Sequence, residues 1–222
     1  MRRMTEEIER QMRELRAGGL GVREIAKATG FSSSTVAVVV KNVSMPVGRY
    51  SKTLLVALCE GSIVDIETTG VEPATSELVT FGSLAGNQVK VLQRVDASEG
   101  EFCDLVRNEL AFLPRPFYAY NASFEATFLN AKLGEDFEWV DIMGPWRERA
   151  EREGWKWPSL DELAPVAREY YGERQTKWSQ VISVWHAYSE SRDKRLLSLI
   201  VRHNMEDLIQ SLYLLAQVDI KT

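Results

Sequence analysis

Two acidic residues, Asp65 and Glu67, lie within an apolar stretch that reads Ser-Ile-Val-Asp-Ile-Glu-Thr-Thr-Gly over residues 62–70. The β-branched residues predict a strand that ends in a Thr-Thr-Gly turn. Because side chains alternate along a strand, both carboxylates point to the same face, about 6–7 Å apart at Cα. Hard oxygen ligands of this kind hold Mg²⁺ or Mn²⁺. The alternative is a strand end at which both acids meet solvent.

Two further groups of residues carry chemistry. An apolar strand at 117–120 runs into Asn121, and a helix then opens with Glu125 in its first turn, where a negative charge is favoured. Asn121 can cap this helix or bond a substrate backbone. Near the C-terminus, His203 and Asp207 are four residues apart in a predicted helix, so both project from one face.

The order and spacing of these groups resemble a known superfamily. The three motifs along the chain are Asp65-x-Glu67, Asn121-x-x-Phe124-Glu125 and His203-x-x-x-Asp207. Over residues 62–216 they resemble the DEDD superfamily of DnaQ-like 3′–5′ exonucleases, which have a ribonuclease H-like fold. Within that group the chain is most similar to the YprB-type ribonuclease H-like nucleases.

The resemblance implies a metal-dependent nuclease, most simply a 3′–5′ exonuclease on single-stranded DNA or RNA. In this interpretation two Mg²⁺ or Mn²⁺ ions are held by four carboxylates, those of Asp65, Glu67, Glu125 and Asp207. His203 would orient or deprotonate the attacking water. The remaining motif residues, Thr68, Asn121 and Phe124, are expected to contact the nucleic acid.

Two positions depart from the superfamily pattern. Its second motif normally ends in Asp, whereas this chain has Glu125, whose extra methylene moves the carboxylate by more than an ångström. Its third motif carries Tyr at the four-residue spacing or His at the five-residue spacing, and here His203 stands at the shorter spacing. These departures keep a second hypothesis open, namely a DNA-binding regulator or adaptor whose nuclease-like domain is inactive.

The N-terminal segment 22–36 resembles the helix-turn-helix of resolvases and bacterial regulators. A small residue stands where two helices would cross, at Ala26, and a turn glycine follows four residues later, at Gly30. In this interpretation Ser33 and Ser34 open the recognition helix, and three cations face phosphates, namely Arg23, Lys27 and Lys41. The alternative is a three-helix module that binds a protein partner.

Charge and periodicity divide the chain of 222 residues. Residues 1–50 hold nine Arg and Lys against five Glu, although the whole chain has a net charge of −5. We expect a small all-α helix-turn-helix domain at 1–46, a linker at 47–61 around Pro46 and Gly48, and an α/β domain at 62–222 with a mixed sheet flanked by helices.

Helices are expected within the first domain at 6–17, 22–29 and 35–42. In the second domain, strands are expected at 77–84, 88–94, 117–120 and 139–142. Helices there are expected at 99–110, 124–133, 143–153, 159–171, 181–189 and 195–217. The apolar runs are too short to span a bilayer, and no signal region opens the sequence, which predicts a cytoplasmic protein without a membrane partner.

Overall fold

The computed structural model describes residues 4–53, 60–164 and 177–217. The chain divides into two compact units, which are described separately: one comprises the chain up to Gly48 together with Arg94–Ser98, and the other comprises the rest. Residues 54–59 of the expected linker and the second half of the helix expected at 159–171 lie outside the described residues.

Three helices form the first unit. They are α1 (Glu6–Ala17), α2 (Val22–Thr29) and α3 (Ser33–Val40). Their apolar faces meet in a small core whose fully buried members are Met12, Ile25, Val36 and Val40. The spacing of apolar residues therefore predicted the three helices, although α3 begins two residues before the expected start.

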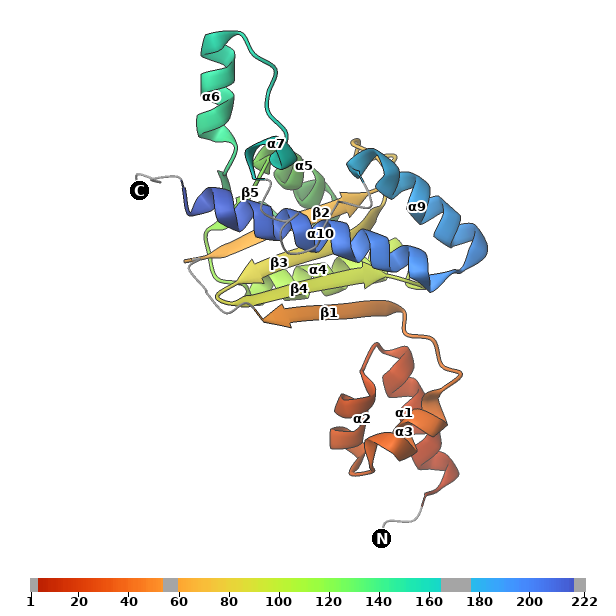
Figure 1. The fold of residues 1–222 in the computed structure, drawn as a ribbon. Coiled ribbons are helices and arrows are strands. Elements are labelled where there is room, and N and C mark those ends of the chain that lie inside the picture. The colour runs from red at the N-terminus through yellow and green to blue at the C-terminus, as the bar shows by residue number, and fades with distance from the viewer. Residues whose placement is uncertain (1–3, 54–59, 165–176, 218–222) are drawn as a thin grey trace. The chain divides into compact units, whose positions relative to one another are not determined.

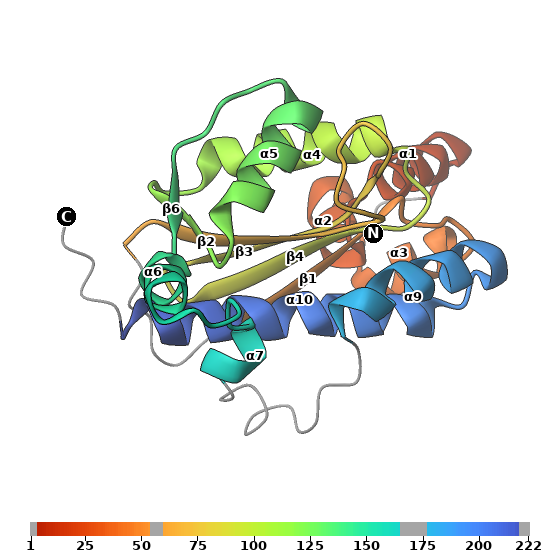
Figure 2. The ribbon, with the colours of Figure 1, turned by 90° about the horizontal axis from the view of Figure 1, so that it is seen from above.

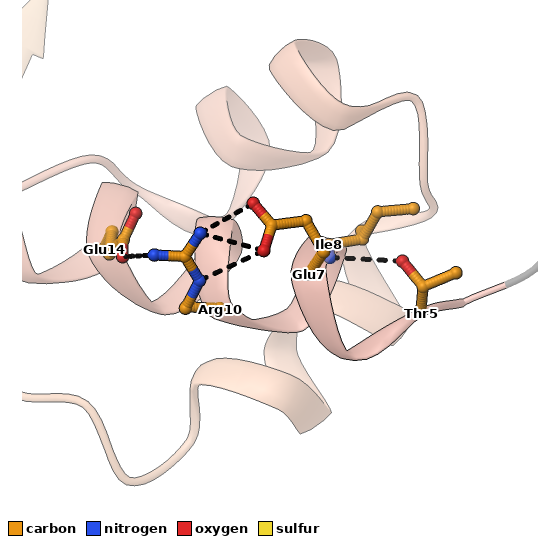
Figure 3. A network of polar contacts seen from close by, with 5 residues as sticks. All are labelled: Thr5, Glu7, Ile8, Arg10 and Glu14. Atoms are coloured by element: carbon orange, nitrogen blue, oxygen red, sulfur yellow. Dashed lines mark hydrogen bonds and ion pairs between the residues drawn. The ribbon is translucent and has the colours of Figure 1, made fainter.

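Local side-chain bonds fix the N-terminal end and the exposed face of α1 (Figure 3). Thr5 caps the helix, because its Oγ1 accepts a hydrogen bond from the Ile8 N–H at 3.3 Å. Arg10 pairs with Glu7 at 2.7 Å and with Glu14 at 3.0 Å, one turn away on either side. These pairs are exposed, so each contributes little to the stability of the fold.

A glycine and a capping serine form the turn between α2 and α3. Gly30 ends α2 in the left-handed region, with φ 75°, and its N–H donates to the Ala26 carbonyl. Ser32 then caps α3, because its Oγ accepts from the Thr35 N–H at 3.1 Å. Gly30 is thus required here, since a side chain at this φ would be strained.

The second unit is built on a six-stranded mixed sheet (Figure 1). Its strands are β1 (Val47–Thr53), β2 (Ser62–Thr68), β3 (Leu78–Ala85), β4 (Gln88–Arg94), β5 (Phe117–Ala119) and β6 (Trp139–Asp141). They lie in the order β1-β4-β3-β2-β5-β6. The strand β3 is antiparallel to both β2 and β4, whereas β5 runs parallel to β2 and to β6. The strand β1 occupies the first part of the segment expected to be a linker.

Helices cover both faces of this sheet (Figure 2). One face carries α4 (Glu99–Phe112) and α5 (Ala122–Leu133), and the other carries α7 (Leu160–Leu163), α9 (Trp178–Ser191) and α10 (Lys194–Leu215). The remaining helix, α6 (Gly144–Glu153), projects from the unit after β6. This is the mixed sheet flanked by helices that the sequence predicts.

The long helix α10 closes one face of the sheet. A continuous apolar cluster joins it to the strands, with the buried members Ile63, Leu84, Val89, Tyr118, Ile142, Ala164, Leu208 and Leu214. Because Ile63 belongs to this cluster, residues 65 and 67 of the same strand also point toward α10. No helix among the described residues is both long and apolar enough to cross a membrane.

Candidate metal centre

The strand β2 carries its two acids beneath α10. Asp65 lies opposite Gly82 of β3, and Glu67 lies opposite Thr80. Glu67 has only 1% of its surface exposed, and Asp65 is partly buried. The desolvation of an ionised carboxylate is expensive unless a cation or hydrogen bonds compensate it. The alternative of a strand end at which both acids meet solvent is therefore wrong for Glu67.

Helix α10 brings His203 and Asp207 to Glu67. The His203 Nε2 atom lies 3.4 Å from Asp207 Oδ2 and 3.8 Å from Glu67 Oε1. One ligand atom from each of these three residues lies within 4.8 Å of the other two. The imidazole is 1% exposed, so it is a buried group and not a surface residue of the helix. The i and i+4 spacing thus places both side chains against the acidic strand, as the sequence predicts.

Asn204 is a site residue that the sequence analysis missed. Its Nδ2 donates to Asp65 Oδ2 at 2.6 Å and to the Asp65 carbonyl at 3.2 Å, and the side chain is fully buried. Gly82 makes room for it, because a Cβ at that position would lie 1.9 Å from Asn204 Oδ1. An isolated glycine in the middle of a strand indicates such a close approach, and this signal was available in the sequence.

Glu125 lies in the first turn of α5 and is buried. Burial raises the pKa of this carboxyl to about 8, a hydrogen bond from its own backbone N–H opposes the rise, and the charges of Asp141 and Asp207 add to it. Its Oε2 atom has no hydrogen-bond partner among the described residues. Because Asp207 acts on Glu125 electrostatically, the second motif faces the same acidic region as the third.

The three residues of this unit that were expected to contact nucleic acid, Asn121, Thr68 and Phe124, make contacts within the protein. Asn121 Oδ1 accepts from Arg147 Nη2 at 3.2 Å and from the Ser123 hydroxyl at 3.0 Å. Thr68 is buried, and its hydroxyl donates to the Gly70 carbonyl at 2.6 Å. Phe124 is half-buried beside Phe128, with ring centroids 5.8 Å apart.

Arg147 is a second residue that sequence analysis passed over. Besides its bond to Asn121, its Nη2 pairs with Asp141 Oδ2 at 2.8 Å. Asp141 ends β6 beside Ala119 of β5, so the pair lies near the start of α5. No spacing rule connects a helix residue at 147 with a capping position at 121, and only the sheet order brings them together.

The predicted DNA contacts of the first unit are all exposed: Arg23, Lys27, Ser33, Ser34 and Lys41. Ser34 Oγ lies 2.9 Å from the hydroxyl of the capping Ser32. These side chains are accessible to a ligand, and DNA contact by them stays a prediction.

The donor set of the centre fits a divalent cation. Carboxylate oxygens from β2, α5 and α10 suit Mg²⁺ and Mn²⁺. The buried Glu125 Oε2 adds an oxygen that lacks a protein donor among the described residues. A cation would compensate the desolvation of these acids, which fits the burial of Glu67 and Glu125.

Two comparisons relate this chain to known proteins. One similar solved structure, described as "apo form of the nuclease", shares 13% sequence identity; the alignment covers 72% of this chain and 88% of that chain, with a TM-score of 0.35. No curated protein matches the chain significantly. A family model described as the RNase_H superfamily matches residues 62–218, which is most of the chain. The chain therefore belongs to the RNase H superfamily.

Proposed function

We propose that this protein is a metal-dependent nuclease that hydrolyses phosphodiester bonds. Membership of the RNase H superfamily supports a nuclease with a nucleic-acid substrate. The observation that carries the proposal is the group formed by Glu67, His203 and Asp207, whose ligand atoms lie within 4.8 Å of one another. The motif order further supports a 3′–5′ exonuclease on single-stranded DNA or RNA.

The residues that would hold two Mg²⁺ or Mn²⁺ ions are Asp65, Glu67, Glu125 and Asp207. When bound, such ions withdraw charge from the scissile phosphate and make water more acidic. The protein supplies the fixed geometry, because Asp65 and Glu67 come from a central strand and Asp207 from a helix packed on it. Asn204 holds the Asp65 carboxylate in one orientation through the 2.6 Å hydrogen bond.

His203 is the group that would move a proton. Its Nε2 faces both Glu67 and Asp207, so a water at this edge of the carboxylates comes within reach of the imidazole. In the proposed reaction Nε2 accepts the proton of the attacking water as the oxygen–phosphorus bond forms. The bond from phosphorus to the 3′ oxygen then breaks, and this oxygen takes a proton from solvent to become the new 3′ hydroxyl of the strand. The released product is a nucleotide with a 5′-phosphate.

The direct test of the function is hydrolysis of single-stranded oligonucleotides by the full chain. Substrates of DNA and of RNA carry a fluorophore at the 5′ end, so that shortening from the 3′ end gives a ladder of labelled products. We expect a ladder with Mn²⁺ and none with EDTA. Intact substrates with Mn²⁺, combined with tight binding of DNA, would instead favour the regulator with an inactive nuclease-like domain.

We further propose that the first unit adds affinity for nucleic acid, not chemistry. Arg23, Lys27 and Lys41 are exposed, so their replacement by Ala should leave the fold intact. The triple variant is expected to bind a 30-base-pair DNA duplex more weakly, with a salt slope that is shallower by about 2–3. Anisotropy titrations at several salt concentrations measure this slope.

A matched control for this triple variant replaces Arg10 and Arg13, which are also exposed cations of the first unit but pair with Glu side chains of α1. This control should bind duplex as the wild type does. If the triple variant also keeps the wild-type affinity and slope, the unit does not bind DNA through these residues, and the protein-binding module becomes the better interpretation.

A further inference from the structure

Two exposed tryptophans follow α6. Gly154 ends this helix in the left-handed region, and the chain then continues without helix or strand through Trp155 and Trp157. Trp155 is 59% exposed and Trp157 is 49% exposed, which is unusual for the side chain with the largest apolar surface. Figure 1 shows α6 projecting from the sheet and the following segment returning toward α7.

An arginine of α6 lies over each of these rings. The Arg147 Cζ atom is 4.7 Å from the centroid of the Trp157 ring, and the Arg149 Cζ atom is 5.4 Å from that of Trp155. The earlier arginine contacts the later tryptophan, so the segment that contains Trp155 and Trp157 runs back along α6, antiparallel to it. Cation–π contacts of this kind hold the indoles in place while leaving about half of each exposed.

The segment is also attached to the sheet beside the acidic centre. The Tyr120 hydroxyl donates to the Pro158 carbonyl at 2.6 Å. The backbone N–H of Trp155 donates to the Ala150 carbonyl of α6 at 2.8 Å. Arg147 connects to Asn121 and Asp141, and Asn121 directly precedes the helix that carries Glu125. A ligand on the two indoles would therefore lie close to residues 120 and 121, which connect β5 to α5.

We propose that Trp155 and Trp157, held by Arg149 and Arg147, form a stacking platform for single-stranded nucleic acid next to the acidic centre. This inference deepens the proposed nuclease function and rests on it. Every base has a flat π-face, so aromatic stacking accepts any sequence, as a nonspecific nuclease requires. A duplex keeps its bases stacked on one another and cannot use the platform.

The flat indole faces, and not net charge, favour a nucleic-acid strand over a protein partner. Both guanidiniums already pair with carboxylates, Arg147 with Asp141 at 2.8 Å and Arg149 with Glu153 at 3.0 Å, so they position the indoles while their charge is balanced. The same stretch also contains Glu148, Glu151 and Glu153, so its overall charge is mixed. We therefore expect the platform to act through stacking, with a contribution to affinity that depends weakly on salt.

The test measures binding without hydrolysis. Full-length wild type and variants are titrated against a fluorescent single-stranded decanucleotide in EDTA, and anisotropy gives the dissociation constant. Trp155→Ala and Trp157→Ala are each expected to weaken binding by about 5- to 150-fold, the range for the loss of one stacked base. Trp155→Phe should recover part of the affinity, because it keeps an aromatic face.

Phe112→Ala is the matched control, because Phe112 is an 88% exposed aromatic residue on α4. It should bind as the wild type does, and thermal unfolding checks that each variant is folded. Wild-type affinity in the Trp155→Ala/Trp157→Ala double variant overturns the platform, as does an equal loss in Phe112→Ala. The platform is also overturned if the wild type does not bind the single strand and the two tryptophans bind a protein instead.

Failure of the nuclease proposal gives a different pattern. Hydrolysis by the wild type is scored separately with Mn²⁺ on the same decanucleotide. If the wild type binds the strand through the tryptophans and does not cleave it, the platform stands and the nuclease does not. If the wild type cleaves the strand and the tryptophan variants bind it equally well, the nuclease stands and the platform does not.

Discussion

Glu67→Gln is expected to lower the hydrolysis of single-stranded oligonucleotides by about 10³-fold or more. The substitution keeps the shape of a side chain that is 1% exposed and removes its negative charge. Stabilisation of the scissile phosphate by a bound cation is worth several kcal/mol, and about 4 kcal/mol corresponds to 10³-fold in rate. The measurement is kcat/KM on a 5′-labelled decanucleotide at saturating Mn²⁺.

Asp104→Asn is the matched control for this acid-to-amide change. Asp104 is an exposed acid of α4 that pairs with Arg107, so its replacement should leave the rate unchanged. Thermal unfolding in metal-free buffer checks that both variants fold. Activity of Glu67→Gln within tenfold of the wild type would mean that the acids of β2 do not form the reactive centre.

His203→Ala is expected to lower turnover by about 10²- to 10⁴-fold, the usual contribution of a general acid–base group. The loss should fall on kcat, because the imidazole lies among the carboxylates and not on the exposed surfaces that would bind a strand. Single-turnover rates at saturating enzyme isolate this step from binding. The affinity for the decanucleotide in EDTA should stay close to that of the wild type.

His203→Gln separates the loss of the imidazole from the loss of packing. Removal of a buried side chain leaves a cavity, which by itself destabilises the fold. The Gln side chain fills most of this space but cannot accept a proton from water at neutral pH. We expect it to be as slow as the Ala variant and nearer to the wild type in thermal stability. Wild-type turnover in either variant would contradict a role for His203 in proton transfer.

The elements that carry the acids followed from local patterns. Residues 62–68 are β-branched and apolar around two acids, and α10 repeats apolar residues at helical spacing, so strand and helix were both predictable. The proximity of this strand and helix was expected because the order of the motifs resembles that of a superfamily with a ribonuclease H-like fold. The sequence could therefore predict which face of β2 the side chains of His203 and Asp207 approach.

The residues that support the centre depend on contacts between distant segments. Asn204 bonds Asp65 across 139 positions of sequence, and it fits only because Gly82 on the neighbouring strand lacks a side chain. Arg147 reaches Asn121 because β6 lies beside β5. Such pairs follow from strand order and register, which a single sequence does not specify.

The first strand shows a different limit. Residues 47–53 read Val-Gly-Arg-Tyr-Ser-Lys-Thr, which lacks both the apolar run of β2 and a clear alternation. Its neighbours Pro46 and Gly48 are typical of a linker. The strand forms at the edge of the sheet beside β4, where backbone pairing and not a buried face specifies it.

Calorimetric titration of the full chain with Mn²⁺ tests most directly whether the acids form a metal centre. The account predicts binding by the wild type and by Asp104→Asn with the same affinity. For Glu67→Gln it predicts an affinity lower by at least 10-fold, because a buried carboxylate of the donor group is lost. Identical titration curves for the wild type and Glu67→Gln would contradict it.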